Sequence, residues 1–214
     1  PAAGVWRNPY GAVIETVDGK REEFDEIILA CHSDQARTLI RDLDHDEAEL
    51  LGAIRYAPNR AVLHRDASLC PRRPGARAAW NYCRDTQDRP ASVTYDMNRL
   101  QGIDPDKPLF VTLNPHREPD PALTFGEFQY DHPQFNTAAL AAQRIFNRIQ
   151  GVRRTWFAGA WLGYGFHEDG LRSGLRVALR LGGQIPWAFA EGDVSGGAWG
   201  KRPALAEPAL TAAE

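Results

Sequence analysis

The stretch from Arg154 to Ala178 limits the possible folds most strongly, because it combines a buried strand, a glycine-rich turn and a helix. Thr155 to Ala158 is a short apolar run, and a helix is predicted from about Asp169 to Gly182. The start of that helix offers unpaired N–H groups and a positive dipole end to negative charge. Glycines leave room for a flat or anionic ligand to approach the backbone, and four lie between the strand and the first turn of the helix: Gly159, Gly163, Gly165 and Gly170.

This turn is not a complete dinucleotide-binding fingerprint. Gly163 and Gly165 have the first spacing of that motif, but Glu168 stands where the third glycine is required. An acidic residue about 20 positions further on, at the end of a second strand, is also missing. We therefore exclude a self-contained G-x-G-x-x-G site in this stretch.

The patterns before residue 60 predict a mixture of strands and helices. Gly11 to Val17 and Arg21 to Phe24, joined by the tight turn Asp18-Gly19, predict a β-hairpin. Ile27 to Ala30 is a continuous apolar run, typical of a strand buried on both faces in a parallel sheet. Two helices are then predicted, one capped by Ser33 or Asp34 and running through Leu43, the other across Ala48 to Ile54 with a capping box of Asp44 and Glu47.

The middle of the chain predicts an antiparallel or mixed sheet, because short β-type segments alternate there with turn-rich pieces. The segments are Ala61 to Arg65, Ala78 to Cys83, Ser92 to Met97 and Leu109 to Leu113. Large residues share one face of their strands, namely Trp80 with Tyr82, and Val93 with Tyr95 and Met97. They predict either core packing or an aromatic substrate cavity.

Two later helices have predicted buried faces. For Thr137 to Gln150, capped by Asn136, this face is Ala138, Ala141, Ala142, Ile145 and Ile149. For the helix after the glycine turn it is Leu171, Gly174, Leu175, Ala178 and Leu179, while Arg172, Arg176 and Arg180 form a solvated stripe.

The glycine-rich stretch resembles the last flavin-binding segment of the FAD-dependent amine oxidase and phytoene desaturase superfamily. The residues that carry the resemblance are Phe157-Ala158-Gly159, Asp169-Gly170-Leu171 and Ser173-Gly174. The chain is similar above all to bacterial NAD/FAD-binding oxidoreductases of this superfamily, over about residues 5 to 180. That wider likeness is carried by Phe24 to Gln35, Asn59 to Arg65, Met97 to Gln101 and Tyr164 to Gly170.

The resemblance implies an α/β fold of two parts. Residues 1–36 and 151–185 would be the C-terminal parts of a Rossmann-type FAD-binding domain, and residues 37–150 a substrate domain with a mixed or antiparallel sheet. An N-terminal glycine-rich unit would lie outside this sequence, so the chain alone is expected to bind FAD weakly or not at all and to be inactive. Residues 186–214 lack periodicity and are expected to be a poorly ordered tail.

The resemblance also implies roles for individual residues. Gly159 and Ala160 would approach the FAD phosphates or ribityl chain, and Gly170 with Leu171 would present N–H groups to the isoalloxazine ring. Candidate cofactor-binding residues from the turn itself are Trp161, Gly165, Phe166 and Asp169.

Two residues of the turn are candidates for catalysis. His167 is either a proton donor near the flavin or a residue that only bonds the helix start. Tyr164 is the second candidate, since an aromatic side chain beside a flavin can stack and exclude water. Asp169, with Glu168, is first of all a cap and a partner of the helix dipole.

Composition excludes several other classes. The net charge of −3 and the lack of a basic run exclude nucleic acid as an expected partner, and no apolar stretch approaches the roughly 20 residues of a membrane helix. No metal site is predicted, because the histidines lack ligand spacing. Three cysteines without C-x-x-C spacing favour a reduced, cytoplasmic setting. Oligomeric state stays open.

The sequence leaves three hypotheses of function. The first is an FAD-dependent oxidoreductase that transfers a hydride between flavin and a largely apolar small molecule, such as an acyl chain or polyene. The second is a non-oxidative flavin-dependent isomerase or mutase. The third is a non-catalytic binding module derived from the same fold.

Overall fold

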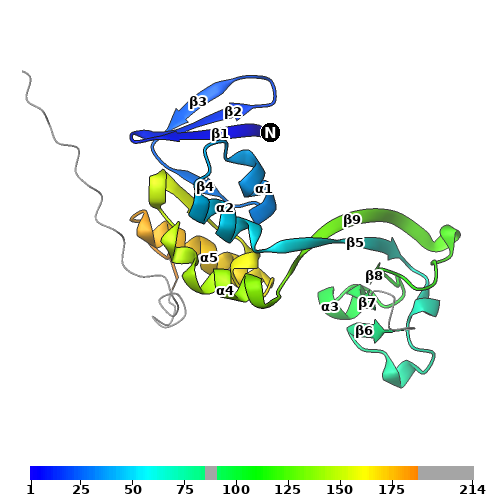
Figure 1. Cartoon of the computed structure of the whole chain (residues 1–214). Helices are drawn as coiled ribbons and strands as arrows, with labels where there is room; N and C mark the ends of the chain where they lie inside the picture. The colour runs from blue at the N-terminus through cyan, green and yellow to red at the C-terminus, as the bar shows by residue number, and fades with distance from the viewer. Residues whose placement is uncertain (85–90, 188–214) are drawn as a thin grey trace, which may run out of the picture. The chain divides into compact units, whose positions relative to one another are not determined.

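A computed structural model of the chain describes residues 1–84 and 91–187. They form two compact units, which Figure 1 shows in cartoon form. The first unit is residues 1–55 together with the chain from residue 133 onward, and the second is residues 56–132. These boundaries differ from the expected ones, because residues 37–55 and 133–150 pack within the first unit. The expected tail lies outside the described residues except for residues 186 and 187.

An antiparallel sheet of three strands opens the first unit. Its strands are β1 (Ala2–Asn8), β2 (Gly11–Thr16) and β3 (Arg21–Phe24), in that order. The predicted hairpin is confirmed, and Gly19 in its turn has φ of 83°, which favours glycine.

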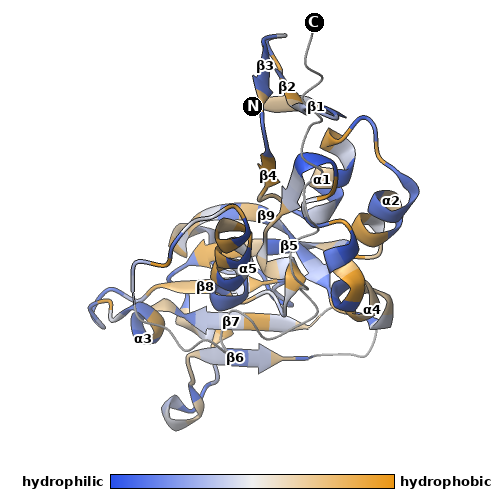
Figure 2. Cartoon of the chain, turned by 90° about the vertical axis from the view of Figure 1, so that its left-hand side faces the viewer, coloured by the Kyte–Doolittle hydropathy of each residue, from blue (hydrophilic) through white to orange (hydrophobic). Residues whose placement is uncertain are grey.

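A two-stranded parallel sheet is the centre of the first unit. It pairs β4 (Ile27–Leu29) with β10 (Thr155–Phe157), residue for residue, from opposite ends of the chain. Figure 2 shows β4 in the hydrophobic colour. All three residues of β10 are buried, but Ile28 is 49% exposed, so the expectation that its strand is buried on both faces is wrong for the described part of the chain.

Two helices follow β4, as predicted. The first, α1 (Ser33–Leu39), is shorter than expected, because Ile40 is extended and forms a bridge with Val5 of β1. The second, α2 (His45–Gly52), begins with the predicted capping box, in which the Asp44 carboxylate accepts from Glu47 N and Glu47 accepts from Asp44 N.

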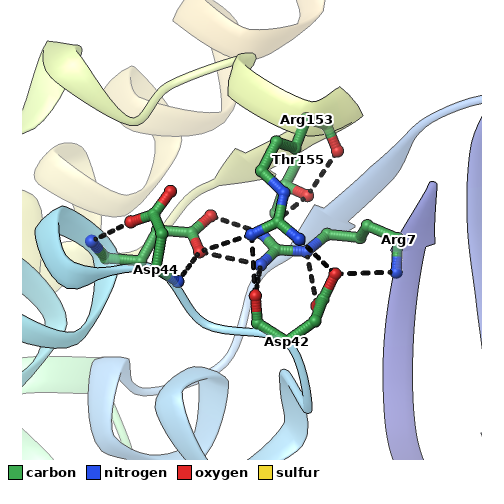
Figure 3. Close-up of polar contacts among 6 residues, drawn as sticks. Arg7, Asp42, Asp44, Arg153 and Thr155 are labelled. Carbon is green, nitrogen blue, oxygen red and sulfur yellow. Dashed lines mark hydrogen bonds and ion pairs between the residues drawn. The ribbon is translucent and has the colours of Figure 1, made fainter. Parts of the chain in front are cut away.

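A buried ion-pair network ties α2 to the strands (Figure 3). The Arg7 guanidinium donates to both carboxylate oxygens of Glu47 and to Asp42, with Nε 2.9 Å from Asp42 Oδ1. The Arg7 and Glu47 side chains are both fully buried. Arg153 donates to the Asp42 carboxylate and carbonyl, and Arg7 Nη1 lies 3.4 Å from Thr155 Oγ1. The network thus joins β1, the segment before α2, α2 itself and the start of β10.

The C-terminal part of the first unit contributes one strand of the parallel sheet and the helices and turns that pack around it. It consists of α4 (Thr137–Ile145), three 3₁₀ turns, β10 and α5 (His167–Arg180); the turns are η4 (Phe146–Arg148), η5 (Val152–Arg154) and η6 (Ala160–Leu162). Asn136 caps α4 as predicted, its Oδ1 accepting from Ala139 N. Phe146 is at the centre of the core, with its ring edge-on to those of Phe157 and Trp161.

The predicted buried faces of both helices need correction. In α4 and the turn after it, the buried stripe is Ala139, Ala142, Phe146 and Ile149, while Ile145 is 39% exposed. In α5 the buried residues are Ser173 and Val177, whereas Leu171 and Leu179 are exposed. Ser173 accepts from Gly159 N, and Val177 packs with Trp156 and Ala158, so the buried side of α5 is the one that faces β10 and the residues directly after it.

The second unit is a five-stranded sheet in the order β6-β7-β8-β5-β9. Four strands match the predicted segments, and they are β5 (Arg55–His64), β6 (Trp80–Cys83), β7 (Ser92–Asp96) and β8 (Phe110–Leu113). Their pairing is antiparallel. The sequence did not predict β9 (Thr124–Gln134) or the short helix α3 (Met97–Gln101), which contains Met97 in place of a strand end. Short 3₁₀ turns complete the unit, at Ala67–Leu69, Pro74–Ala76 and Pro121–Leu123.

The aromatic face predicted for this sheet is exposed. Trp80 and Tyr82 are 63% and 65% exposed, so the core-packing interpretation is wrong for these two residues within the described chain. Along the described residues, none of the helices has the length and apolar character to cross a membrane.

Candidate functional site

The candidate site lies where the strands of the parallel sheet end. β10 is followed by Ala158, Gly159 and η6, and β4 is followed by Cys31 and the start of α1. Since the strands are parallel, both carboxyl ends lie at the same edge of the sheet. Ligands of open α/β sheets bind outside this edge. The geometry therefore places the predicted glycine turn where the fold class puts its ligands.

Gly159 is held between the strand and α5. Its N–H donates to Ser173 Oγ at 2.9 Å, and the Ser173 hydroxyl donates to the Gly170 carbonyl at 2.7 Å. A Cβ at Gly159 would lie 2.3 Å from Trp161 Nε1. The glycine is thus required by the protein's own packing.

Trp161 belongs to the core of the first unit. Its side chain is 3% exposed, its Nε1 donates to the Cys31 carbonyl at 3.0 Å, and its ring packs on Phe146. The indole is therefore part of the protein core and supports the turn from the buried side. This corrects the expectation that the Trp161 side chain contacts a cofactor.

The Asp169 carboxylate closes the turn onto α5. Its Oδ2 accepts from Tyr164 N and Phe166 N, each at 3.0 Å. A Cβ at Gly163 would lie 2.4 Å from this carboxylate, and Gly165 has φ of 89°, so both glycines are required by the turn. The role of Asp169 as a cap is confirmed by these contacts, and its predicted contact with the cofactor stays a prediction.

Gln143 of α4 holds the turn from the other side, a role the sequence did not predict. Its Nε2 donates to the carbonyls of Trp161 and Gly163, both at 2.7 Å. Gln150 similarly bonds both backbone groups of Phe157 in β10 and is fully buried. A polar residue within an apolar helix stripe is the signal that would have found them.

The tip of α5 projects from this framework. Tyr164 and Phe166 are each 68% exposed, and the Tyr164 ring makes an edge contact with Phe135, at 6.4 Å between centroids. His167 is the first residue of the helix and is exposed. The backbone N–H groups of His167 and Glu168 have no acceptor among the described residues.

The expected donors at Gly170 and Leu171 need correction. The Gly170 N–H already donates to the Phe166 carbonyl at 3.2 Å, and Leu171 lies one turn inside the helix. The N–H groups left for a ligand are therefore those of His167 and Glu168, because only the first turn of a helix leaves its donors unpaired. Ala160, half-buried at the start of η6, lies against Gly170, whose Cβ would be 3.7 Å from Ala160 N.

Two titratable groups outside the turn have shifted pKa values. His64 belongs to the second unit, and burial lowers its pKa. Burial also raises the pKa of the Cys31 thiol, which lies at the carboxyl end of β4. A search of the described residues finds no cluster of three His, Cys, Asp or Glu side chains that could hold a metal ion.

Comparison with known proteins identifies the fold. No protein-family model matches this sequence, and no curated protein matches it. Solved structures do match, and they are enzymes of the FAD-dependent amine oxidase superfamily. Cyclohexylamine oxidase from Brevibacterium oxydans is 16% identical with a TM-score of 0.56, over 84% of this chain and 47% of that one.

Two further matches are not oxidases. A fatty acid isomerase from P. acnes that produces CLA is 16% identical, with a TM-score of 0.55 over 84% of this chain and 46% of that one. Reduced UDP-galactopyranose mutase is 12% identical, with a TM-score of 0.57 over 92% and 49%. The predicted mixed α/β fold of this superfamily is thus confirmed, and the chain spans about half the length of the structures it matches.

Proposed function

We propose that this chain is the part of an FAD-dependent enzyme that contributes the turn at the start of α5 to the flavin site. One observation carries the proposal: an exposed helix tip with unpaired N–H groups stands at the carboxyl edge of a parallel sheet, in a chain with the fold of flavoenzymes. The donors fit FAD, since N–H groups at a positive helix end suit its phosphates or the carbonyl edge of its ring.

The residues have different tasks in this proposal. Gly159, Ala160 and Gly165 are the backbone against which the cofactor lies, and the donors of the helix tip are His167 N and Glu168 N. The Tyr164 and Phe166 side chains cover the cofactor and exclude water. Asp169, Gly170 and Trp161 hold the turn in place through the contacts described above, and Leu171 offers an exposed apolar surface beside it.

When bound, FAD supplies the acceptance or release of a hydride. The protein orients substrate and cofactor, keeps water out and manages protons. We propose that the His167 imidazole exchanges the accompanying proton, because an imidazole can both donate and accept a proton and this one is exposed at the helix tip. Tyr164 is the second candidate for this step.

The reaction we propose is hydride transfer between flavin and a largely apolar small molecule, such as an acyl chain or a polyene. A non-oxidative isomerase or mutase is the alternative, favoured by the two matches of that kind. Net consumption of oxygen or another electron acceptor during turnover would support the oxidoreductase, and turnover without it would support the alternative. A binding module without cofactor is the third candidate.

The test is an absorption spectrum of the full natural protein that contains this sequence, purified with and without added FAD. We expect flavin bands in the blue and near ultraviolet. Protein that is folded by circular dichroism but shows no flavin bands, even after FAD is added, would contradict the proposal and favour the binding module.

A further inference from the structure

A pocket in the second unit has the features of a ligand site and is independent of the flavin proposal. Its volume is about 400 Å³, within the size range of small-molecule sites. It opens beside β6 and β7, the two strands drawn side by side in Figure 2. The side chains that matter for its chemistry are Ser92 and Thr94 of β7, Arg72, Arg117 and the apolar Leu69.

Buried hydroxyls form one wall of this pocket. Ser92 is 5% exposed, and its hydroxyl has no hydrogen-bond partner among the described residues. Thr94 is 3% exposed, and the only partner of its hydroxyl in the same part of the chain is Thr112 Oγ1, at 2.9 Å. Both residues line the pocket, and the Ser92 hydroxyl uses none of its hydrogen-bonding capacity and the Thr94 hydroxyl only part of it within the described chain, so both hydroxyls can bond a polar ligand.

The hydrogen of the Thr94 hydroxyl can be placed by following the contacts from His64. The backbone N–H of Asp66 donates to His64 Nδ1 at 3.1 Å, and burial keeps the imidazole neutral by lowering its pKa. The ring proton is therefore on Nε2, which donates to Thr112 Oγ1 at 2.7 Å. Thr112 is fully buried and has no other acceptor within the described chain, so its hydroxyl donates to Thr94. The Thr94 hydrogen is then left for the pocket.

Two guanidinium groups add positive charge to the pocket. Arg117 Nη2 donates to the Ser68 carbonyl and to Ser68 Oγ, at 2.5 and 2.8 Å, which fixes the side chain and leaves Nη1 and Nε for a ligand. Neither Arg72 nor Arg117 forms an ion pair within the part of the chain that the structure describes, and no carboxylate lines the pocket. Asp66, in the chain just before the pocket, is engaged by the backbone N–H groups of Ser68 and Asp120.

We propose that this pocket binds a small carboxylate that bears an apolar group. The carboxylate lies between Arg117, Arg72 and the hydroxyls of Ser92 and Thr94, all of which donate. The apolar group lies against the apolar part of the lining, which includes Leu69, Cys70, Pro71 and the Tyr82 ring. This combination favours a carboxylate with a hydrocarbon part over inorganic phosphate.

The test uses hexanoate as probe, followed by amide chemical shifts of the whole ¹⁵N-labelled chain. We expect saturable shifts at Ser92, Thr94 and Arg117, and binding weakened about tenfold or more in Arg117→Gln, because hydrogen bonds to charged groups are the strong ones. Arg73→Gln is the matched control, an exposed neighbour of Arg72 that does not line the pocket, and it should bind hexanoate normally. Ser92→Ala tests the hydroxyl wall and should weaken binding severalfold.

Four outcomes would overturn the proposal. The first two are no chemical shift change with hexanoate at tens of millimolar, and binding of hexanol as strong as that of hexanoate. The other two are the same shift changes when inorganic phosphate is added in place of hexanoate, and an equal loss of hexanoate affinity in Arg117→Gln and Arg73→Gln. The amide spectrum itself shows whether each variant is folded. Because no flavin is added, a failure here leaves the absorption test of the flavin proposal untouched.

Discussion

Arg7→Met should destabilise the first unit strongly, because it removes the cation at the centre of the buried network. The Glu47 carboxylate is fully buried and, among residues 1–84 and 91–187, would keep only Asp44 N at 3.1 Å and Arg153 Nη1 at 3.6 Å. Removing one partner of a buried ion pair costs about 3–5 kcal/mol, and the remaining Arg153 places this case toward the lower end. Hydrogen exchange at β1 and β10 should therefore become at least about a hundredfold faster.

Hydrogen exchange suits this prediction better than a melting curve, since a chain of two units need not unfold in one step. The control is Lys20→Met, which breaks the exposed pair with Glu22 and should change stability by less than about 1 kcal/mol. The double variant Arg7→Met/Glu47→Met should recover a large part of the loss, because it removes both charges together. Equal effects of Arg7→Met and Lys20→Met, or additive losses in the double variant, would refute the reasoning.

Further predictions concern the turn and the second unit. Gly159→Ala should cost about 1–3 kcal/mol, because its Cβ would collide with Trp161 Nε1, and urea unfolding followed by exchange at β10 measures this; an unchanged value would be evidence against the packing described. In the full natural protein Gly170→Val should abolish flavin retention, whereas Gly170→Ala should retain it, since a single Cβ makes ordinary contact with Ala160. Flavin content read by absorbance decides this, and equal content in both variants would count against the placement of the tip. The free energy of unfolding of the second unit should be highest above pH 6.5, the ordinary pKa of His64. At lower pH it should decrease by up to about 1.4 kcal/mol per pH unit, because burial lowers the pKa of His64 in the folded state and the unfolded chain therefore binds the proton first. His64→Gln should flatten this slope in exchange measured at β5 and β8, and a slope that persists would assign it to other groups.

Local signals predicted the elements whose determinants are close in sequence. The hairpin at Gly19, the capping box of Asp44 and Glu47, the Asn136 cap and four strands of the second unit each depend on a few neighbouring residues, and the structure confirms them. β9 was missed because Gly126 and Pro133 interrupt its pattern, and its pairing beside β5 determines its conformation.

The sequence predicted which segment forms the candidate site, but it did not predict most of the contacts that hold that segment in place. The turn and the helix tip follow from the glycines and the strand before them. The supports do not, because Gln143, Ser173 and Cys31 reach the turn only after α4, α5 and β4 have packed together. The prediction of the buried face of α5 was wrong for the same reason, because periodicity selects the leucines whereas packing buries Ser173 against Gly159 and Val177 against Trp156 and Ala158.

The division of the first unit by the second has a consequence for biosynthesis. β5 and β9, the strands by which the chain enters and leaves the second unit, are neighbours in one sheet, so that unit is complete once residue 132 has left the ribosome. β4 must wait for β10, and until then its apolar residues stay exposed on the nascent chain. Chains stalled at successive lengths and then released should therefore gain protease resistance first in the second unit, residues 56–132. Residues 1–55, although they are synthesised first, should become protease-resistant last.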